Sequence, residues 1–257
     1  METNILVVVE GKKTEPQLLQ RLSKSFGLDF DIYCLESNIY TLYKELKAID
    51  FNGNIKDILA ELHPEQKEML SKKFVYTYLI FDCDAHHPKR DDKRTIEEIV
   101  NANFGKLEEM SDYFVDETDP TVGRLYINFP MVESFKDCDF FFDPSYANNQ
   151  VDIQDLKHYK EIVSKRLLAR IRTDQFTQKN WLSLILQNIY KLSCIETGIW
   201  DKPTYGAYTF ESQLANVIHA EKNIIEANKS LAVLNMSLFI VLDYFGNRDG
   251  FYDQLTQ

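Results

Sequence analysis

The most constraining feature of the sequence is a short apolar run that ends in a carboxylate. Ile5 to Val9 contains no polar residue, and Glu10 and Gly11 follow it directly. A run this apolar is typical of a strand covered on both faces, as in the centre of a parallel sheet. Such sheets place their functional groups at the carboxyl ends of the strands. The pattern therefore predicts a buried strand with Glu10 at its tip.

A second apolar run, Val75 to Phe81, ends in Asp82 and, two residues later, Asp84. Because side chains alternate along an extended chain, we expect both aspartates on the same side, about 7 Å apart. If the two strand tips are neighbours, three carboxylates meet, and their repulsion must be relieved by protonation or by a cation. Hard oxygen ligands suit Mg²⁺ or Mn²⁺. The simpler alternatives are a turn for the aspartates and a helix cap or surface position for Glu10.

Strand and helix patterns alternate through the first 140 residues. Further strands are expected at 30–35 and 124–128, and helices at about 14–27, 38–49, 55–62, 65–72 and 95–110. Thr14 and Glu15 are expected to cap the first helix, and Thr95 with Glu98 has the form of a capping box. This alternation predicts an α/β fold, a parallel sheet flanked by helices with right-handed crossovers.

The remaining sequence is expected to be mainly helical. Residues 140–151 are rich in aromatic residues, Pro and Asn, which suggests an irregular connection and a domain boundary. We therefore predict one domain over 1–145 and a helical domain over 146–257. Its helices are expected at about 155–172, 176–197, 210–229 and 231–244.

A third polar motif follows the strand expected at 124–128. Asn128 is followed by Pro130 and Glu133, and Lys136 lies three residues after Glu133, so both share a face if Pro130 opens a short helix. Glu133 could equally be an ordinary exposed residue.

Taken together, these motifs resemble the TOPRIM domain. The order is strand-Glu-Gly-x-x-Thr-Glu, then strand-Asp-x-Asp, and the Asn-x-Pro-x-x-Glu segment is similar to that of stand-alone RloB/AbiL-type nucleases, relatives of the OLD type in bacterial defence. The resemblance implies a Rossmann-like TOPRIM fold and Mg²⁺-dependent cleavage of phosphodiester bonds in DNA or RNA. It implies roles for Glu10 as metal ligand or general acid/base, Asp82 and Asp84 as ligands, Glu133 as a further ligand and Lys136 as a charge stabiliser.

The same resemblance implies a setting in anti-phage defence, of the abortive-infection type, beside a separate ATPase. The sequence has no P-loop: Gly11-Lys12-Lys13-Thr14 lacks the upstream glycine. Two alternatives stay open. One is a non-catalytic metal-binding partner of an ATPase; the other is a phosphatase, because Asp82 to His86 is similar to the Asp-x-Asp-x-Thr motif of haloacid-dehalogenase-type enzymes, with His86 in place of Thr.

Charge alone disfavours a nucleic-acid partner, since the net charge is −11. The distribution is more favourable: residues 157–179 hold seven Lys or Arg against two acids. We predict that one helical face in this run binds the phosphate backbone, through Lys165, Arg166, Arg170 and Arg172. A solvated helix face is the alternative, as it is for a smaller cluster at Lys89, Arg90, Lys93 and Arg94.

The cysteines bear on location. Cys34, Cys83, Cys138 and Cys194 are scattered without a Cys-x-x-Cys pair, which argues against a disulfide scaffold or a zinc ribbon. No signal peptide is recognisable, and the apolar stretch 231–242 is too short to span a bilayer. We therefore expect a cytoplasmic protein without a membrane partner.

Overall fold

The computed structural model describes residues 5–87, 93–114, 121–203, 213–246 and 250–255. Its centre is a parallel sheet in the order β2-β1-β3-β4. The strands are β1 (Ile5–Val9), β2 (Asp31–Cys34), β3 (Tyr76–Asp82) and β4 (Arg124–Asn128). The predicted α/β class, the parallel sheet and the adjacency of the two acid-tipped strands are confirmed.

The register of the sheet brings the polar strand ends to one level. Val9 pairs with Ile80 and Asp82 pairs with Asn128, so the tips of β1, β3 and β4 lie along the same edge. All five residues of β1 are buried, which agrees with a strand covered on both faces. The strand order reverses between β1 and β3, and in open α/β sheets ligands bind at the carboxyl edge of such a switch point.

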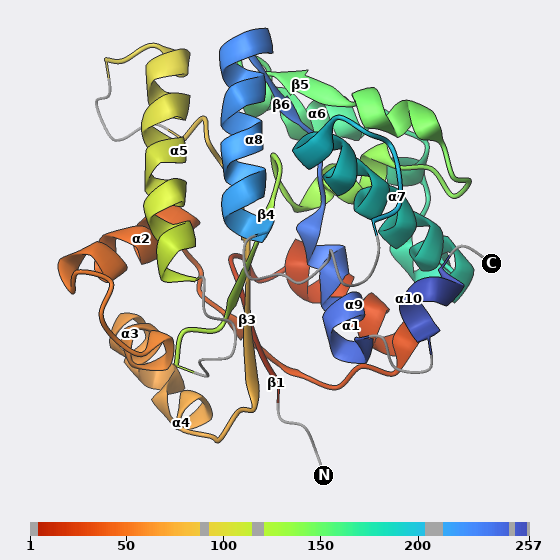
Figure 1. Cartoon of the computed structure of the whole chain (residues 1–257). Coiled ribbons are helices and arrows are strands. Elements are labelled where there is room, and N and C mark those ends of the chain that lie inside the picture. The colour runs from red at the N-terminus through yellow and green to blue at the C-terminus, as the bar shows by residue number, and fades with distance from the viewer. Residues whose placement is uncertain (1–4, 88–92, 115–120, 204–212, 247–249, 256–257) are drawn as a thin grey trace.

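Helices cover both faces of this sheet (Figure 1). On one side lie α2 (Ile39–Ala48), α3 (Ile55–Leu62), α4 (Lys67–Leu70) and α5 (Ile96–Tyr113), and on the other lie α1 (Thr14–Phe26) and α9 (Ile240–Phe245). The predicted capping box is confirmed, because Thr95 and Glu98 bond reciprocally at the start of α5. Gly27 ends α1 in the left-handed conformation that glycine adopts without strain.

The later part of the chain is helical in part, with several short elements. Strand β4 is followed by the 3₁₀ segments η2 (Val132–Asp137) and η3 (Pro144–Asn148). Strands β5 (Gln150–Asp152) and β6 (Ser230–Ala232) then pair as a two-stranded antiparallel sheet. The long helices α7 (Gln178–Thr197) and α8 (Gln213–Asn228) lie between these two strands in the sequence. The chain between β5 and α7 forms η4 (Leu156–His158), α6 (Tyr159–Val163), η5 (Leu168–Arg170) and η6 (Thr173–Gln175). After β6 it continues through η9 (Met236–Phe239), α9 and α10 (Phe251–Gln254).

Two helix predictions are wrong in this part. The helix expected at 155–172 is broken into short turns, because its buried residues Leu156, Tyr159, Val163 and Leu168 are three, four and then five positions apart, and the last interval does not fit a helical repeat. The helix expected at 231–244 begins as β6, since a fully buried apolar run suits a short strand as well as a helix. Residues 210–212 of the third expected helix lie outside the described residues.

The two parts of the chain touch closely. Phe129 and Leu234 form an antiparallel bridge, and Lys222 of α8 forms an ion pair with Glu108 of α5 at 2.8 Å. One hydrophobic cluster includes side chains from both sides of the predicted boundary at 145/146. The boundary, as a statement about independent folding, stays a prediction.

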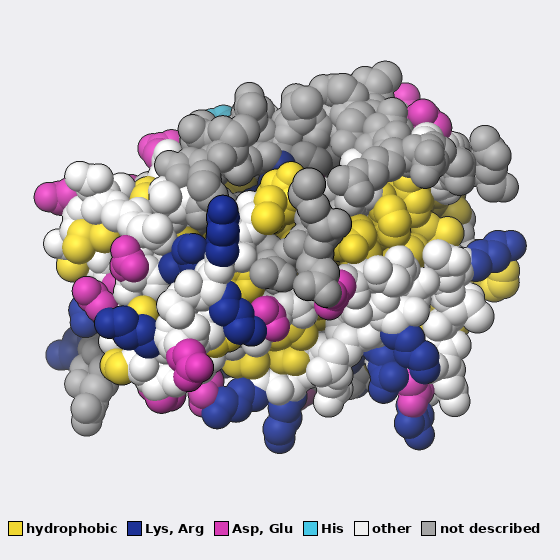
Figure 2. Space-filling model, turned by 90° about the horizontal axis from the view of Figure 1, so that it is seen from below, with side chains coloured by type: hydrophobic (Ala, Val, Ile, Leu, Met, Phe, Trp, Pro, Cys, Tyr) yellow, Lys and Arg dark blue, Asp and Glu magenta, His cyan; other side chains and the backbone are white. Residues whose placement is uncertain are grey.

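The surface on the lower side of Figure 1, where β1 and β3 begin, carries Lys and Arg side chains interspersed with Asp and Glu around apolar patches (Figure 2). Its described part shows no single-sign patch that would attract a polyanion. Among the described helices, none is long and apolar enough to cross a membrane. All four cysteines are free thiols, as expected.

Candidate metal-binding and catalytic site

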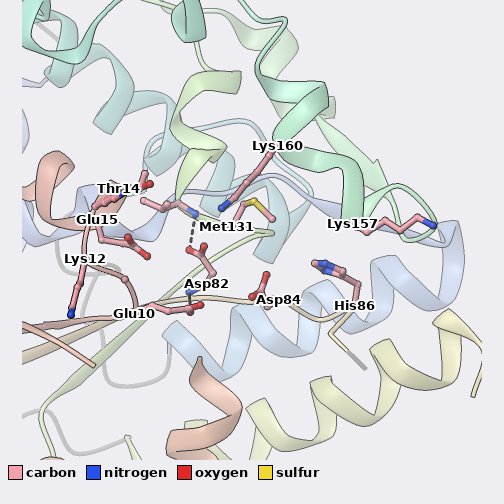
Figure 3. Close-up of a pocket in the computed structure, with 13 residues that line it drawn as sticks. Glu10, Lys12, Thr14, Glu15, Asp82, Asp84, His86, Met131, Lys157 and Lys160 are labelled. Carbon is pink, nitrogen blue, oxygen red and sulfur yellow. Dashed lines mark hydrogen bonds between the residues drawn. The ribbon is translucent and has the colours of Figure 1, made fainter. Parts of the chain in front are cut away.

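Glu10 and Asp82 meet at the tips of β1 and β3. The backbone amide of Asp82 donates a hydrogen bond to Glu10 Oε2 at 3.4 Å, and Figure 3 shows the carboxyl groups of Glu10, Asp82 and Asp84 facing one cavity. The predicted convergence of these three acids is therefore present. The aligned register of β1 and β3 produces it.

Asp82 is held in one orientation by the next strand and the turn after it. Its Oδ1 accepts hydrogen bonds from the amide of Val132 at 2.7 Å and from Asn128 Nδ2 at 3.4 Å. Asn128 is fully buried, and its Oδ1 accepts from the amide and hydroxyl of Ser237 at 3.1 and 2.8 Å. A segment near the end of the chain thus supports an acid on the central sheet.

Asp84 reaches the site by a route that strand alternation does not describe. Strand β3 ends at Asp82, and Asp84 adopts the left-handed conformation, with φ of 40°. Its amide donates to Pro130 O at 3.4 Å, and its carbonyl accepts from the amide of His87 at 2.8 Å. Aspartate tolerates this backbone better than most residues, and such outliers are common at functional sites. The expectation of an extended Asp82–Asp84 segment is wrong, although both side chains face the cavity.

Burial and mutual repulsion perturb these acids. Burial, followed by repulsion from Asp84, raises the pKa of Glu10 to about 8. Burial also raises the pKa of Asp82 well above its usual value, and Glu10 and Asp84 add to the rise. Without a cation, the group therefore retains protons at neutral pH.

Two further acids adjoin these three. Glu15 and Glu133 are both buried, and each repels Asp82. Glu133 Oε2 has no hydrogen-bond partner among the described residues. Burial, then repulsion from Glu133, raises the pKa of Glu15, while backbone amides, including that of Gly11, lower it. We call these five residues the acid cluster: Glu10, Glu15, Asp82, Asp84 and Glu133.

Sequence reasoning missed two members of this site. Glu15 was expected to cap α1, yet the helix begins after Lys13 and the Glu15 side chain turns toward the acid cluster. Lys160 on α6 reaches down toward Asp82, with its Nζ 3.5 Å from Glu133 Oε1 (Figure 3). The excess of cations in 157–179 was the only signal for Lys160, because α6 is distant from the strands in sequence.

Lys136 does not line the cavity at the acid cluster. Its Nζ lies over the ring of Phe135, 5.6 Å from the ring centroid, although Glu133 on the same 3₁₀ segment faces Lys160. The three-residue spacing of Glu133 and Lys136 thus does not bring both to the acids. A cation at this site comes instead from Lys160.

The other predicted cations are dispersed. Arg166 Nε donates to Asp137 Oδ1 at 2.6 Å, and Arg172 donates to Asp174 Oδ2 at 2.5 Å. Lys165 and Arg170 are exposed on separate turns. The four residues do not lie on one helical face, contrary to the prediction. Their contact with nucleic acid therefore stays a prediction, and a shared helical face no longer supports it. Lys89 and Arg90 of the smaller cluster lie outside the described residues.

A cavity of about 570 Å³ opens over the acid cluster. Its wall includes Glu10, Glu15, Asp82, Asp84, His86, Lys157 and Lys160. A second cavity of about 390 Å³ adjoins it, and both walls contain Glu10, Gly11, Lys12 and Asp84. The acids are therefore accessible from the surface on two sides of the β1 tip.

The acid cluster offers hard oxygen donors of the kind that Mg²⁺ prefers, but the described residues do not arrange them as a metal cage. In the described part of the chain, no group of three or more His, Cys, Asp or Glu side chains is arranged to hold a metal ion. One oxygen of Asp82 already accepts hydrogen bonds from backbone and amide groups. Mg²⁺ commonly uses only one or two carboxylates, with waters and substrate phosphates completing its shell. The unpartnered Glu133 Oε2 and the crowded carboxylates suit that mode.

Comparison with known proteins adds no relative. No family model matches the chain, and no curated protein and no solved structure is similar to it.

Proposed function

We propose that this chain is a metal-dependent nuclease that cleaves phosphodiester bonds at the acid cluster. The observation that carries the proposal is the crowding of Glu10, Asp82 and Asp84 at the switch point of the sheet, beside an open cavity. Structural carboxylates are normally neutralised within the protein, whereas these repel one another. The TOPRIM-like motifs support the same chemistry.

Asp82, Asp84 and Glu10 would hold Mg²⁺ or Mn²⁺, with Glu133 as a further ligand. When bound, the ion supplies Lewis-acid stabilisation of charge on the phosphate. Asn128 and the Val132 amide keep Asp82 oriented, which reduces reorganisation during the reaction.

Glu10 and Lys160 are placed for the remaining roles. Glu10 is half-buried at the cavity wall and, once its own proton has been displaced by a bound cation, could accept the proton of an attacking water. The ammonium of Lys160 can leave Glu133 for a phosphate oxygen, since its side chain is 65% exposed. Lys160 would thus be the charge stabiliser, the role that the resemblance implied for Lys136.

Two measurements on the purified chain test the proposal. Labelled DNA and RNA oligonucleotides should be cut in Mg²⁺ or Mn²⁺ and remain intact in EDTA. Electron paramagnetic resonance should show Mn²⁺ bound to the wild type and lost in Glu10→Gln. Asp112→Asn, an exposed acid on α5, is the matched control and should behave as wild type. Cleavage that persists in EDTA would rule the proposal out.

A non-catalytic partner is the second candidate. The ion pair of Lys160 with Glu133 keeps one of the possible ligands away from a metal, which suits a chain whose acids serve structure and not catalysis. Mn²⁺ binding without cleavage of any oligonucleotide would favour it. Covalent phosphate on Asp82 would favour the phosphatase alternative instead.

The wider setting rests on the motif resemblance alone. We place the nuclease in an anti-phage, abortive-infection type of defence, acting in the cytoplasm with a separate ATPase. An ATPase gene beside this one, and joint purification of the two products, would support the placement. An isolated gene whose deletion leaves phage sensitivity unchanged would contradict it.

A further inference from the structure

The groove at the acid cluster continues past Asp84 toward α2 and α5. The second cavity shares Asn38 and His87 with a third cavity of about 450 Å³. The three cavities therefore adjoin in series, and the acid cluster lies at one end of this path. Such an extended path is longer than the reaction at one phosphate requires.

The far cavity has a composition of its own. Its wall includes Tyr40, Tyr43, Lys44 and Lys106, and among the residues that the structure describes it includes no carboxylate. Lys160 lines the cavity at the acid cluster, and Lys12, which pairs with Glu36 at 2.6 Å, lines both that cavity and the second one. Cations thus stand on both sides of the acid cluster, as an extended polyanion would need.

Lys106 is fixed relative to Asp84. Its Nζ donates to Asn103 Oδ1 at 2.6 Å and lies 4.8 Å from the centre of the Tyr40 ring. Asn103 is 1% exposed, and its Nδ2 donates to the carbonyls of Ala85 and His87 at 2.8 and 3.1 Å.

Tyr40 is tied to the same turn. Its hydroxyl donates to the carbonyl of Cys83 at 2.5 Å. Tyr40 and Asn103 therefore bind the turn on both sides of Asp84, so the far cavity and this acid share one set of hydrogen bonds. A buried polar residue that positions an ammonium beside a groove is a built feature, since a surface lysine would need no such support.

We propose that this far cavity is a subsite for a single-stranded nucleic acid, in which Lys44 and Lys106 bind phosphates next to the one that is cleaved. Tyrosine rings beside cations are the usual means of holding a single strand, because bases stack on the rings and phosphates pair with the amines. The subsite rests on the proposed function, since it serves the strand that the acid cluster cuts.

The test compares charge removal inside and outside the far cavity. Binding of a short fluorescein-labelled single strand is measured by anisotropy at several salt concentrations, with Ca²⁺ present and with EDTA. Lys44→Gln combined with Lys106→Gln should weaken binding about tenfold or more and reduce the slope of log affinity against log salt by about 1.4, or 0.7 for each lost phosphate contact.

The control is Lys47→Gln. Lys47 lies on the same helix as Lys44, is exposed and pairs with Glu109 at 2.5 Å, and it does not line the cavity. The Lys47→Gln variant should leave the affinity for the single strand and the slope of log affinity against log salt unchanged. Lys44→Gln alone should reduce the slope by about 0.7, which covers the case in which the Lys106 variant does not fold.

The outcomes separate this subsite from the nuclease itself. Metal-dependent cleavage together with a double variant that binds like Lys47→Gln would overturn the subsite and leave the nuclease standing. Tighter binding of a duplex than of the single strand would overturn the assigned ligand. A wild type that neither binds nor cuts any oligonucleotide would overturn both.

Discussion

The two ends of β4 place buried acids in opposite surroundings. At the amino end, Arg124 forms an ion pair with Asp243, and the hydroxyl of Tyr126 donates to the same carboxylate. At the carboxyl end, Asn128 donates to Asp82, whose neighbours Glu10 and Asp84 are acids too.

The pKa values follow this difference. Burial raises the pKa of Asp243 only to about 6, because Arg124 lowers it, whereas burial and like charges raise the pKa of Glu10 to about 8. Asp243 has a counter-ion, Arg124, within the fold. The acids around Glu10 must be neutralised by protons or by a ligand. The two ends of β4 therefore differ in kind: the amino end takes part in a structural ion pair, and the carboxyl end adjoins the candidate site.

The largest expected effect on stability is at the paired end. Arg124→Met should lower the free energy of unfolding at pH 7 by about 3–5 kcal/mol, because it leaves the buried charge of Asp243 uncompensated. Urea denaturation measures the loss. The double variant Arg124→Met with Asp243→Asn should recover most of it, and a loss below about 1 kcal/mol in the single variant would remove the contrast.

At the other end, neutralising an acid should remove function without harming the fold. Asp84→Asn keeps a residue that tolerates the left-handed backbone, so its melting temperature in EDTA should equal or exceed that of wild type. Metal-dependent cleavage should fall by at least about 100-fold, or roughly 2.7 kcal/mol. Undiminished cleavage in Mg²⁺ would show that Asp84 is not part of the site.

The pH dependence of stability sharpens the comparison. The folded-state pKa of Glu10, about 8, lies above its ordinary 4.5, so the folded chain keeps a proton that the unfolded chain has released. In EDTA, the contribution of Glu10 to stability is greatest below about pH 4.5 and is lost as pH rises from there through 8. Glu10→Gln should remove most of this fall in urea titrations at stepped pH. Parallel curves for variant and wild type would contradict the assigned shift.

The smallest expected effect belongs to Lys160. Its ammonium lies 3.5 Å from the buried carboxylate of Glu133, but the Lys160 side chain is 65% exposed, so Lys160→Met should lower stability in EDTA by only about 1 kcal/mol. Its cleavage rate should nevertheless fall if the ammonium binds substrate, whereas Lys157→Met should leave the rate nearer to wild type. Equal cleavage rates for Lys160→Met and Lys157→Met would show that Lys160 contributes only its ion pair with Glu133.

Local patterns predicted the sheet and most of the acid cluster. Apolar runs such as Ile5 to Val9 can be buried on both faces only in a covered sheet, and the strand ends then place Glu10 and Asp82 together. The capping box at Thr95 is equally local. These features depend on neighbouring residues in the chain, which periodicity detects.

The missed features depend on distant residues. The left-handed turn at Asp84 is held by Pro130, and Lys160 reaches the acids only because α6 lies above the sheet edge. Strand β6 forms because β5, some 80 residues earlier, offers it a partner, as the 80-residue separation of Ser230 and Gln150 shows. In each case the two partners lie too far apart in the sequence for a local pattern to connect them.

The bond from Ser237 to Asn128 has an evolutionary consequence. Asn128 orients Asp82, so the segment around Ser237 and the strand tips form one inherited unit despite the 109 positions between them. A gene duplication or fusion that copied only residues 1–145 would carry the acids without this support. Descendants of this chain that still use the acids should therefore retain a donor at position 237 together with Asn128.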